Sequence, residues 1–233
     1  MTFPKTLICL ANSVRNQKHC VAGKEWTDAG PGKWIRPIHS EADQEISMAD
    51  QTYPNGKHPI PGDFFKLTIE RPYPDGNQTE NHIIDRSKKW EAAGRASWAD
   101  IEACIDADVE RIWTVGDSSN RGENDKILAK DRQSIGSSLM LVRPRNFVLH
   151  VTKEYDPRAG REKWKNRASF EFGNLEYRFV VTDPVLWSEY VERWDEADYE
   201  LQDVIICISM MGTRIDTNTT KLVAAVLERE NFE

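Results

Sequence analysis

Residues 168–181 have the sequence ASFEFGNLEYRFVV, and this segment predicts a β-hairpin. Aromatic residues alternate with polar ones on both sides of the Gly173-Asn174 pair. This pair is typical of a two-residue hairpin turn, because Gly and Asn adopt positive φ angles at low cost. We therefore expect antiparallel β structure around this segment.

Short apolar or alternating runs predict further strands on both sides of the hairpin. They cover residues 6–10, 20–25, 34–37, 64–70 and 82–85 near the N-terminus, and residues 139–142, 147–151, 204–209 and 221–227 in the second half. Polar, Gly-rich or Pro-rich segments separate these runs, as expected for short strands joined by turns.

Two helices are expected between these strands. Ser97 is a good N-cap for a helix that starts at Trp98, and apolar residues then recur every three or four positions as far as Ile112. A second helix is expected after Asp183, where Pro184 fits the first helical position. Its apolar face runs to Trp194.

The pattern predicts a mainly β fold with some α structure (α+β). Small Greek-key barrels of the oligonucleotide/oligosaccharide-binding (OB) type have strands of this length and number. We expect a first OB-like barrel at residues 1–85, a helical connector at 86–137, and a second OB-like barrel at 138–228 with an inserted helix near 184–196.

The composition indicates a folded, acidic, cytoplasmic protein. The 233 residues carry a formal net charge of −7, which disfavours charge-driven coating of DNA. The four Cys are widely spaced, so we expect free thiols in a reducing compartment rather than disulfides or a zinc site. No apolar run approaches the roughly 20 residues of a membrane span, and no signal peptide is evident.

Motifs for phosphate loops, dinucleotide binding and metal proteases are missing from the sequence, so we expect neither a metal nor a cofactor. Asp63 and Glu70 flank one predicted strand, and these two carboxylates are the basis for considering a metal-dependent phosphodiester hydrolase. The alternative is that Asp63 belongs to a turn and Glu70 to a solvated strand end.

Basic and aromatic residues interleave in the second half of the chain. Residues 138–182 carry nine basic and five acidic side chains, whereas residues 183–233 carry four and twelve. Exposed rings that stack on bases, beside cations that hold phosphates, suit single-stranded nucleic acid or nucleotides. The candidates are Arg143, Arg145, Trp164, Lys165, Arg167 and Phe170. The alternative is a hairpin loop made soluble by its charges.

A second set of candidates lies in the first half, and consists of Arg15, Lys24, Trp34 and Arg36. Arg36 lies inside an apolar strand pattern, so its charge needs a specific partner. That partner is either a carboxylate of the protein or an anionic ligand. The polar residues Gln78, Glu80 and Asn81 form either a turn network or a recognition edge.

The chain resembles the bacterial dual OB-containing domain family. The resemblance rests on residues 8–13, 20–25, 34–38, 78–81, 167–172, 181–184 and 221–225, and it spans about residues 5 to 228. It implies two barrels, one in each half, and a role in recognising nucleic acid or nucleotides in conflict or defence systems. It implies no catalytic residues. The basic pair that usually follows Asn-Ser in the family is changed here to Val14-Arg15.

We therefore expect a non-enzymatic protein that recognises single-stranded nucleic acid or a nucleotide-like ligand. A protein-interaction adaptor is the alternative, with the acidic segment 183–203 as its docking surface. A metal-dependent hydrolase is the third possibility.

Overall fold

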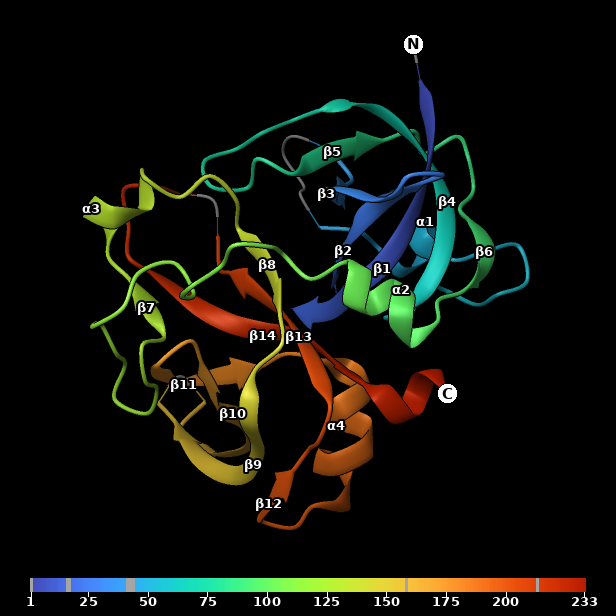
Figure 1. Ribbon diagram of the computed structural model, residues 1–233. Helices are drawn as coiled ribbons and strands as arrows, with labels where there is room; N and C mark the ends of the chain where they lie inside the picture. Colours follow the sequence, from blue (N-terminus) through green and yellow to red (C-terminus); the bar gives the residue numbers. More distant parts are fainter. Residues whose placement is uncertain (1, 16–17, 41–44, 158, 213) are drawn as a thin grey trace.

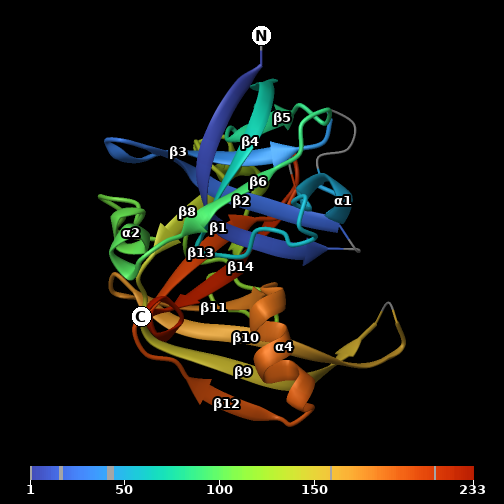
Figure 2. The ribbon, with the colours of Figure 1, turned by 90° about the vertical axis from the view of Figure 1, so that its right-hand side faces the viewer.

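The computed structural model describes residues 2–15, 18–40, 45–157, 159–212 and 214–233, and the two halves of the chain lie one above the other (Figures 1 and 2). The first half contains the strands β1 (Phe3–Arg15), β2 (Lys18–Thr27), β3 (Gly30–Ile38), β4 (Asp63–Pro72), β5 (Asn81–Ile84) and β6 (Glu91–Arg95), and the short helix α1 (Met48–Gln51).

Five of these strands form a closed barrel. The order is β1-β2-β3-β5-β4, and β4 also pairs with β1, which closes the ring. The 13-residue strand β1 is long enough to pair with β2 along one part and with β4 along another. Gly23 on β2 permits the close approach to β1, because a Cβ there would lie 2.1 Å from the carbonyl oxygen of Ile8.

The second half forms an eight-stranded sheet. Its elements are β7 (Lys126–Ile127), β8 (Leu139–Val142), β9 (Arg145–Asp156), β10 (Arg161–Phe172), β11 (Leu175–Val181), β12 (Ala197–Glu200), β13 (Val204–Met210) and β14 (Thr219–Glu228). The order is β12-β9-β10-β11-β14-β13-β8, with β7 paired to β14. Only Arg143 and Pro144 separate β8 from β9, so one bent segment of chain pairs with β13 at one end and with β10 at the other.

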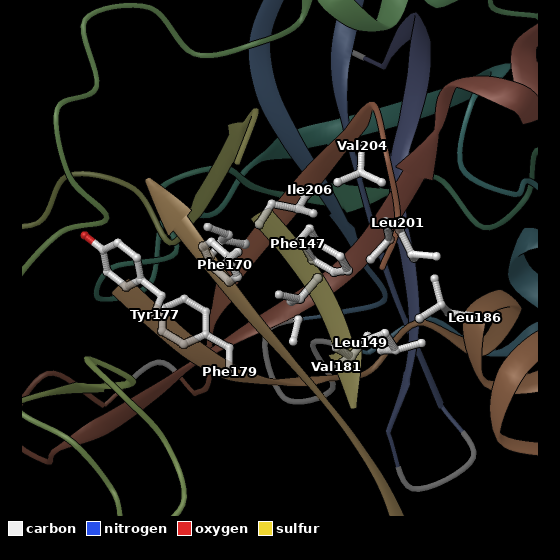
Figure 3. Packing of buried hydrophobic residues seen from close by; sticks show 14 of the residues in the cluster. Phe147, Leu149, Phe170, Tyr177, Phe179, Val181, Leu186, Leu201, Val204 and Ile206 are labelled. Atoms are coloured by element: carbon white, nitrogen blue, oxygen red, sulfur yellow. The ribbon is translucent and has the colours of Figure 1, made fainter. Parts of the chain in front are cut away.

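The predicted hairpin is confirmed as β10 and β11. Phe172 lies opposite Leu175, so Gly173 and Asn174 form a two-residue turn, and Gly173 has a φ of +60°. Phe170 and Tyr177 are cross-strand partners, and their rings stack at 5.5 Å. Both rings are buried in the core of the second half (Figure 3).

The helical content of residues 86–137 is lower than the sequence predicts. Helix α2 (Trp98–Ala103) is capped by Ser97 as expected, but it ends at Ala103 instead of continuing to Ile112. The described remainder contains strands β6 and β7 and the four-residue helix α3 (Ala129–Arg132), so a continuous helical connector is not confirmed.

The reason is that the apolar residues of this segment serve two different cores. Ile101 and Cys104 pack in the cluster between the halves, whereas Ile112 packs in the core of the second half. Between them, Asp106 is held by tertiary hydrogen bonds and Asp108 has a positive φ of 58°. A single helix cannot satisfy these contacts.

The second predicted helix is present as α4 (Pro184–Tyr190), followed by the 3₁₀ turns η1 (Val191–Arg193) and, at the C-terminus, η2 (Arg229–Phe232). The carboxylate of Asp183 accepts hydrogen bonds from the backbone N–H groups of Val185 and Leu186. Trp194 does not belong to the apolar face of this helix. It follows η1 with a left-handed backbone, and its residue surface is 55% exposed.

A shared apolar cluster joins the halves. It brings β1 and β2 of the barrel together with α2, β8, β13 and β14 of the rest of the chain, through small or aliphatic side chains such as Ala11, Leu141, Ala225 and Leu227. Contact across this cluster fixes the position of each half relative to the other. No helix in the described chain has the length and apolar character needed to cross a membrane.

Candidate functional site

Arg36 is buried on β3 and contacts residues from both halves. Its Nη2 lies 3.2 Å from Glu80 Oε1 and donates to Ser138 Oγ at 3.0 Å. Ser209 Oγ is a third, longer acceptor at 3.4 Å. Ser138 in turn donates through its hydroxyl to Glu80. The partner that the apolar strand pattern required is therefore a carboxylate of the protein.

This contact explains the polar cluster at residues 78–81. Glu80 is 4% exposed, and its charge is compensated by Arg36 and by hydrogen bonds from Ser138. Gln78 is oriented by Asn81, whose Nδ2 donates to Gln78 Oε1 at 3.1 Å. The segment is a buried network that connects the barrel to β8 and β13.

A pocket of about 390 Å³ opens beside Arg36, between the two halves. Its walls combine strands β1, β2 and β3 with β11, β13 and β14. Ser13, Cys20, Arg36, Gln78, Thr182 and Leu222 all line it, and each comes from a different one of the segments that carry the family resemblance. The fold thus gathers residues that are spread over about 200 positions of the sequence.

Lys24 and Trp34 are bound to Asp106, outside this pocket. Lys24 Nζ lies 2.5 Å from Asp106 Oδ1, and Trp34 Nε1 donates to Asp106 Oδ2 at 3.1 Å. The same Oδ2 accepts the backbone N–H of Leu141 at 2.8 Å. These contacts connect the two halves. The polar groups of Lys24 and Trp34 are thus already bound to a carboxylate of the protein. Arg15 is the last residue of β1, and its side chain lies outside the described part of the structure.

Trp164, Lys165, Arg167 and Phe170 do not converge on one face. Successive residues of a strand point to opposite faces, so Trp164 and Phe170 lie on the core side of β10 and Lys165 and Arg167 on the other. Phe170 is 3% exposed, and its ring is inaccessible to a base. Lys153 Nζ lies over the Trp164 ring, 4.9 Å from its centroid. The ring of Trp164 also packs against that of Trp194, with 5.9 Å between the two centroids.

Arg167 forms a bidentate ion pair with Glu154: Nε donates to Oε1 at 2.7 Å, and Nη2 donates to Oε2 at 3.1 Å. Arg121 Nη1 lies 3.1 Å from the same carboxylate, and its side chain is 47% exposed. One carboxylate cannot neutralise two guanidinium groups, so this cluster keeps a positive charge. These contacts hold the pKa of Glu154 below its usual value, chiefly through the hydrogen bond from Arg167.

This cationic cluster adjoins the pocket. Arg167 is the cross-strand partner of Val180, and Val180 lines the pocket. Lys165 lies two residues from Arg167 on the same face of β10, and within the described residues no carboxylate pairs with it. Val180, Arg167 and Lys165 therefore share one face of the second sheet, and Arg121 is bound at that face through Glu154.

Arg143 and Arg145 lie at a separate place, near the bend between β8 and β9. Arg143 forms an ion pair with Glu102 on α2, and Arg145 donates to the carbonyl of Gly173 at 2.8 Å. Both side chains are exposed, and both are tied to neighbouring elements. They brace the hairpin and α2 rather than extend the surface beside the pocket.

The remaining chemical candidates are accounted for by local contacts. Asp63 pairs with Arg95 at 3.1 Å and accepts the backbone N–H of Ile60, and Glu70 is exposed at the end of β4. Among the described residues, no group of three or more His, Cys, Asp or Glu side chains could hold a metal ion. All four cysteines are free thiols, and burial raises the pKa of Cys104 to about 12.

The acidic segment 183–203 contains an exposed aromatic residue. Trp194 has a φ of +59°, an unusual conformation for a bulky side chain. Exposed carboxylates lie on both sides of Trp194 in the sequence, and two of them contact strand β9. Asp198 accepts a hydrogen bond from His150, and Glu196 accepts one from the backbone N–H of Lys153. A protein partner for this segment remains a prediction.

Comparisons with solved structures give distant fold matches. A replication protein A heterotrimer bound to ssDNA matches with a TM-score of 0.33 and 9% identity, over 96% of this chain and 49% of that chain. The tetrameric p202 HIN2 structure matches with a TM-score of 0.28 and 10% identity, over 96% and 88% of the two chains. The present chain thus spans about half the length of the replication protein A chain.

No curated protein matches the sequence. Residues 5–226 match the family described as the dual OB-containing domain. The match covers nearly all of the sequence, and it includes the closed barrel, the pocket and the cationic cluster beside it. The chain therefore belongs to the dual OB-containing domain family.

Proposed function

We propose that the protein recognises single-stranded nucleic acid or a nucleotide-like ligand on the surface formed by the pocket and the adjoining cations. A base would enter the pocket between the halves, and phosphates would contact Arg121 and Lys165. The observation that carries this proposal is the contiguity of the two features, through the cross-strand pair of Val180 and Arg167.

The proposal includes a second barrel in the C-terminal half. The parallel pair of β11 and β14 corresponds in position to the parallel pair of β3 and β5 in the closed barrel. The bent segment formed by β8 and β9 would then be the first strand of this barrel, shared between two parts of the sheet as β1 is in the first half. The pocket would lie where the two barrels meet.

The electrostatics favour a ligand with few phosphate contacts. Each phosphate that a protein contacts on a single strand contributes about −0.7 to the slope of log K against log salt concentration. With Arg121 and Lys165 as the two contacts, the expected slope is shallow, about −1.4. This fits an acidic protein, because long-range repulsion disfavours a long phosphate track.

Fluorescence anisotropy with short labelled single strands at several salt concentrations tests this proposal. The double variant Arg121→Gln with Lys165→Gln should lose nearly all of the salt slope. A matched control is Lys33→Gln with Lys57→Gln, which removes two exposed cations of the first half and should leave the slope unchanged. Arg167 is unsuitable for this test, since its substitution would release Glu154.

Two results would refute the proposal. One is no binding at low salt, and the other is a slope that the Arg121 and Lys165 substitutions leave unchanged. A slope reduced equally by the control pair would indicate that net charge, and not this surface, governs binding.

A further inference from the structure

Among the residues that the structure describes, those that bind the guanidinium group of Arg36 do so through one nitrogen. The contacts with Glu80, Ser138 and Ser209 all use Nη2. Nε is buried and has no hydrogen-bond partner among the described residues. The side chain is 8% exposed and lines the pocket. Because an unpaired buried donor is unfavourable, an acceptor supplied beside this group would be favoured.

The charge of Arg36 is already compensated. Glu80 lies at 3.2 Å with a side chain that is only 2% exposed, and Glu45 also lines the pocket. A phosphate or carboxylate inside the pocket would therefore face these carboxylates without an excess of positive charge. The part of a ligand that fits beside Arg36 is uncharged and carries hydrogen-bond acceptors.

The walls suit a planar ring. Val180, Met210, Met211 and Leu222 are apolar, and Met side chains adapt their shape to flat surfaces. Hydroxyl groups and the Gln78 amide supply polar contacts at the edges. The volume of about 390 Å³ lies within the range of roughly 300–1,000 Å³ that is usual for small-molecule sites.

We infer that this pocket selects a guanine-type base through Arg36. Guanine presents two adjacent acceptors, O6 and N7, and arginine is the side chain that most often binds this edge. Adenine places an amino group where guanine has O6, so two donors would then face each other. The inference rests on the proposed function for the presence of a base, and it adds which base the pocket accepts.

Nucleosides without phosphate provide the sharpest test, because they isolate the pocket from the cations. Isothermal titration calorimetry should show that guanosine and inosine, which share O6 and N7, bind several-fold more tightly than adenosine. Replacing N7 by carbon in 7-deazaguanosine should weaken binding several-fold. Because Nη2 already contacts Glu80, Ser138 and Ser209, Arg36 would bind this edge through a remaining nitrogen, and a preference of roughly fivefold is expected.

Two variants assign the effect to the pocket. Met211→Trp should fill it and weaken guanosine binding more than tenfold, and its 38% exposure allows the fold to accept a larger ring. Ile215→Trp is the matched control, because Ile215 lies four residues away, is 40% exposed and does not line the pocket. Arg36→Lys keeps the charge that faces Glu80 and should abolish the preference for guanosine over adenosine.

Equal binding of guanosine and adenosine would overturn the inference. So would guanosine binding that Met211→Trp leaves unchanged. Both results are distinct from failure of the proposed function, which is measured with oligonucleotides and the Arg121 and Lys165 substitutions. Oligonucleotides that bind with the expected salt slope but show no base preference would leave the proposed function standing and remove this inference.

Discussion

Replacement of Glu228 by Gln should stabilise the protein at alkaline pH and not at pH 5. Glu228 lies at the end of β14 and is 6% exposed. Its pKa is raised from 4.5 to about 7, chiefly by burial and also by the charges of Glu189 and Glu230, while a hydrogen bond from Tyr190 lowers it.

The direction of this stability change with pH follows from whether Glu228 binds its proton in the folded and in the unfolded state. Between pH 4.5 and 7 the unfolded chain loses the Glu228 proton while the folded protein keeps it. The stability that this proton contributes is fully present below pH 4.5 and is lost as the pH rises through 7. Above pH 7 the folded parent protein carries a buried carboxylate, whereas the Glu228→Gln variant carries a neutral amide at this position.

The pKa shift of Glu228 sets an upper bound on the stability that Glu228→Gln can gain. One pKa unit corresponds to 1.36 kcal/mol, so the shift has an upper bound of about 3 kcal/mol. Solvent near the end of the strand screens the neighbouring charges, and about 1–2 kcal/mol is the expected gain at pH 8. For a chain of this length, that corresponds to an increase in Tm of roughly 2–8 °C.

Differential scanning calorimetry of both proteins from pH 4.5 to 8.5 measures this effect. The difference in Tm between Glu228→Gln and the parent protein should be small at pH 5 and should grow through pH 7. Because other carboxylates titrate equally in both proteins, they cancel from the difference. A difference that stays constant across this range would refute the reasoning.

Substitutions at three further positions test the fold. Gly173→Ala should cost about 2 kcal/mol or more in urea unfolding, because φ is +60° and a Cβ would lie 2.4 Å from the Glu110 carbonyl oxygen. Asp106→Asn should lower the free energy of unfolding in urea by about 2–4 kcal/mol, since it leaves Lys24 unpaired between the halves. Trp194→Asn should change the Tm little, because relief of about 1–2 kcal/mol of left-handed strain offsets a similar lost contact with Trp164, whereas Trp194→Val should lower the Tm.

The strands and the hairpin could be predicted because their signals are local. The alternation around Gly173-Asn174 and the cap at Ser97 depend on neighbouring residues, and the structure contains both. The predicted extension of α2 to Ile112 is wrong because periodicity does not show which core a residue enters. Ile101 and Ile112 have helical spacing, yet each packs in a different cluster.

The candidate site was only partly predictable. A charge within an apolar strand correctly indicates that Arg36 has a specific partner, and the sequence also places Glu80 in a polar cluster. The pocket itself could not be predicted, because its walls come from strands of both halves. The separation of Trp164 from Lys165 was available from the sequence, since adjacent residues of a strand point to opposite faces.

The distribution of charge determines how such a protein can achieve selectivity. In a molecule with a net charge of −7, a long cationic groove would compete with general repulsion of phosphates. The structure instead pairs several basic side chains with carboxylates of the protein, among them Lys24, Arg143 and Arg167. Under the proposed function, recognition depends on contacts with uncharged parts of a ligand, and the pocket beside Arg36 would supply them. Salt dependence and base preference should then be separable, because the proposal assigns them to different side chains.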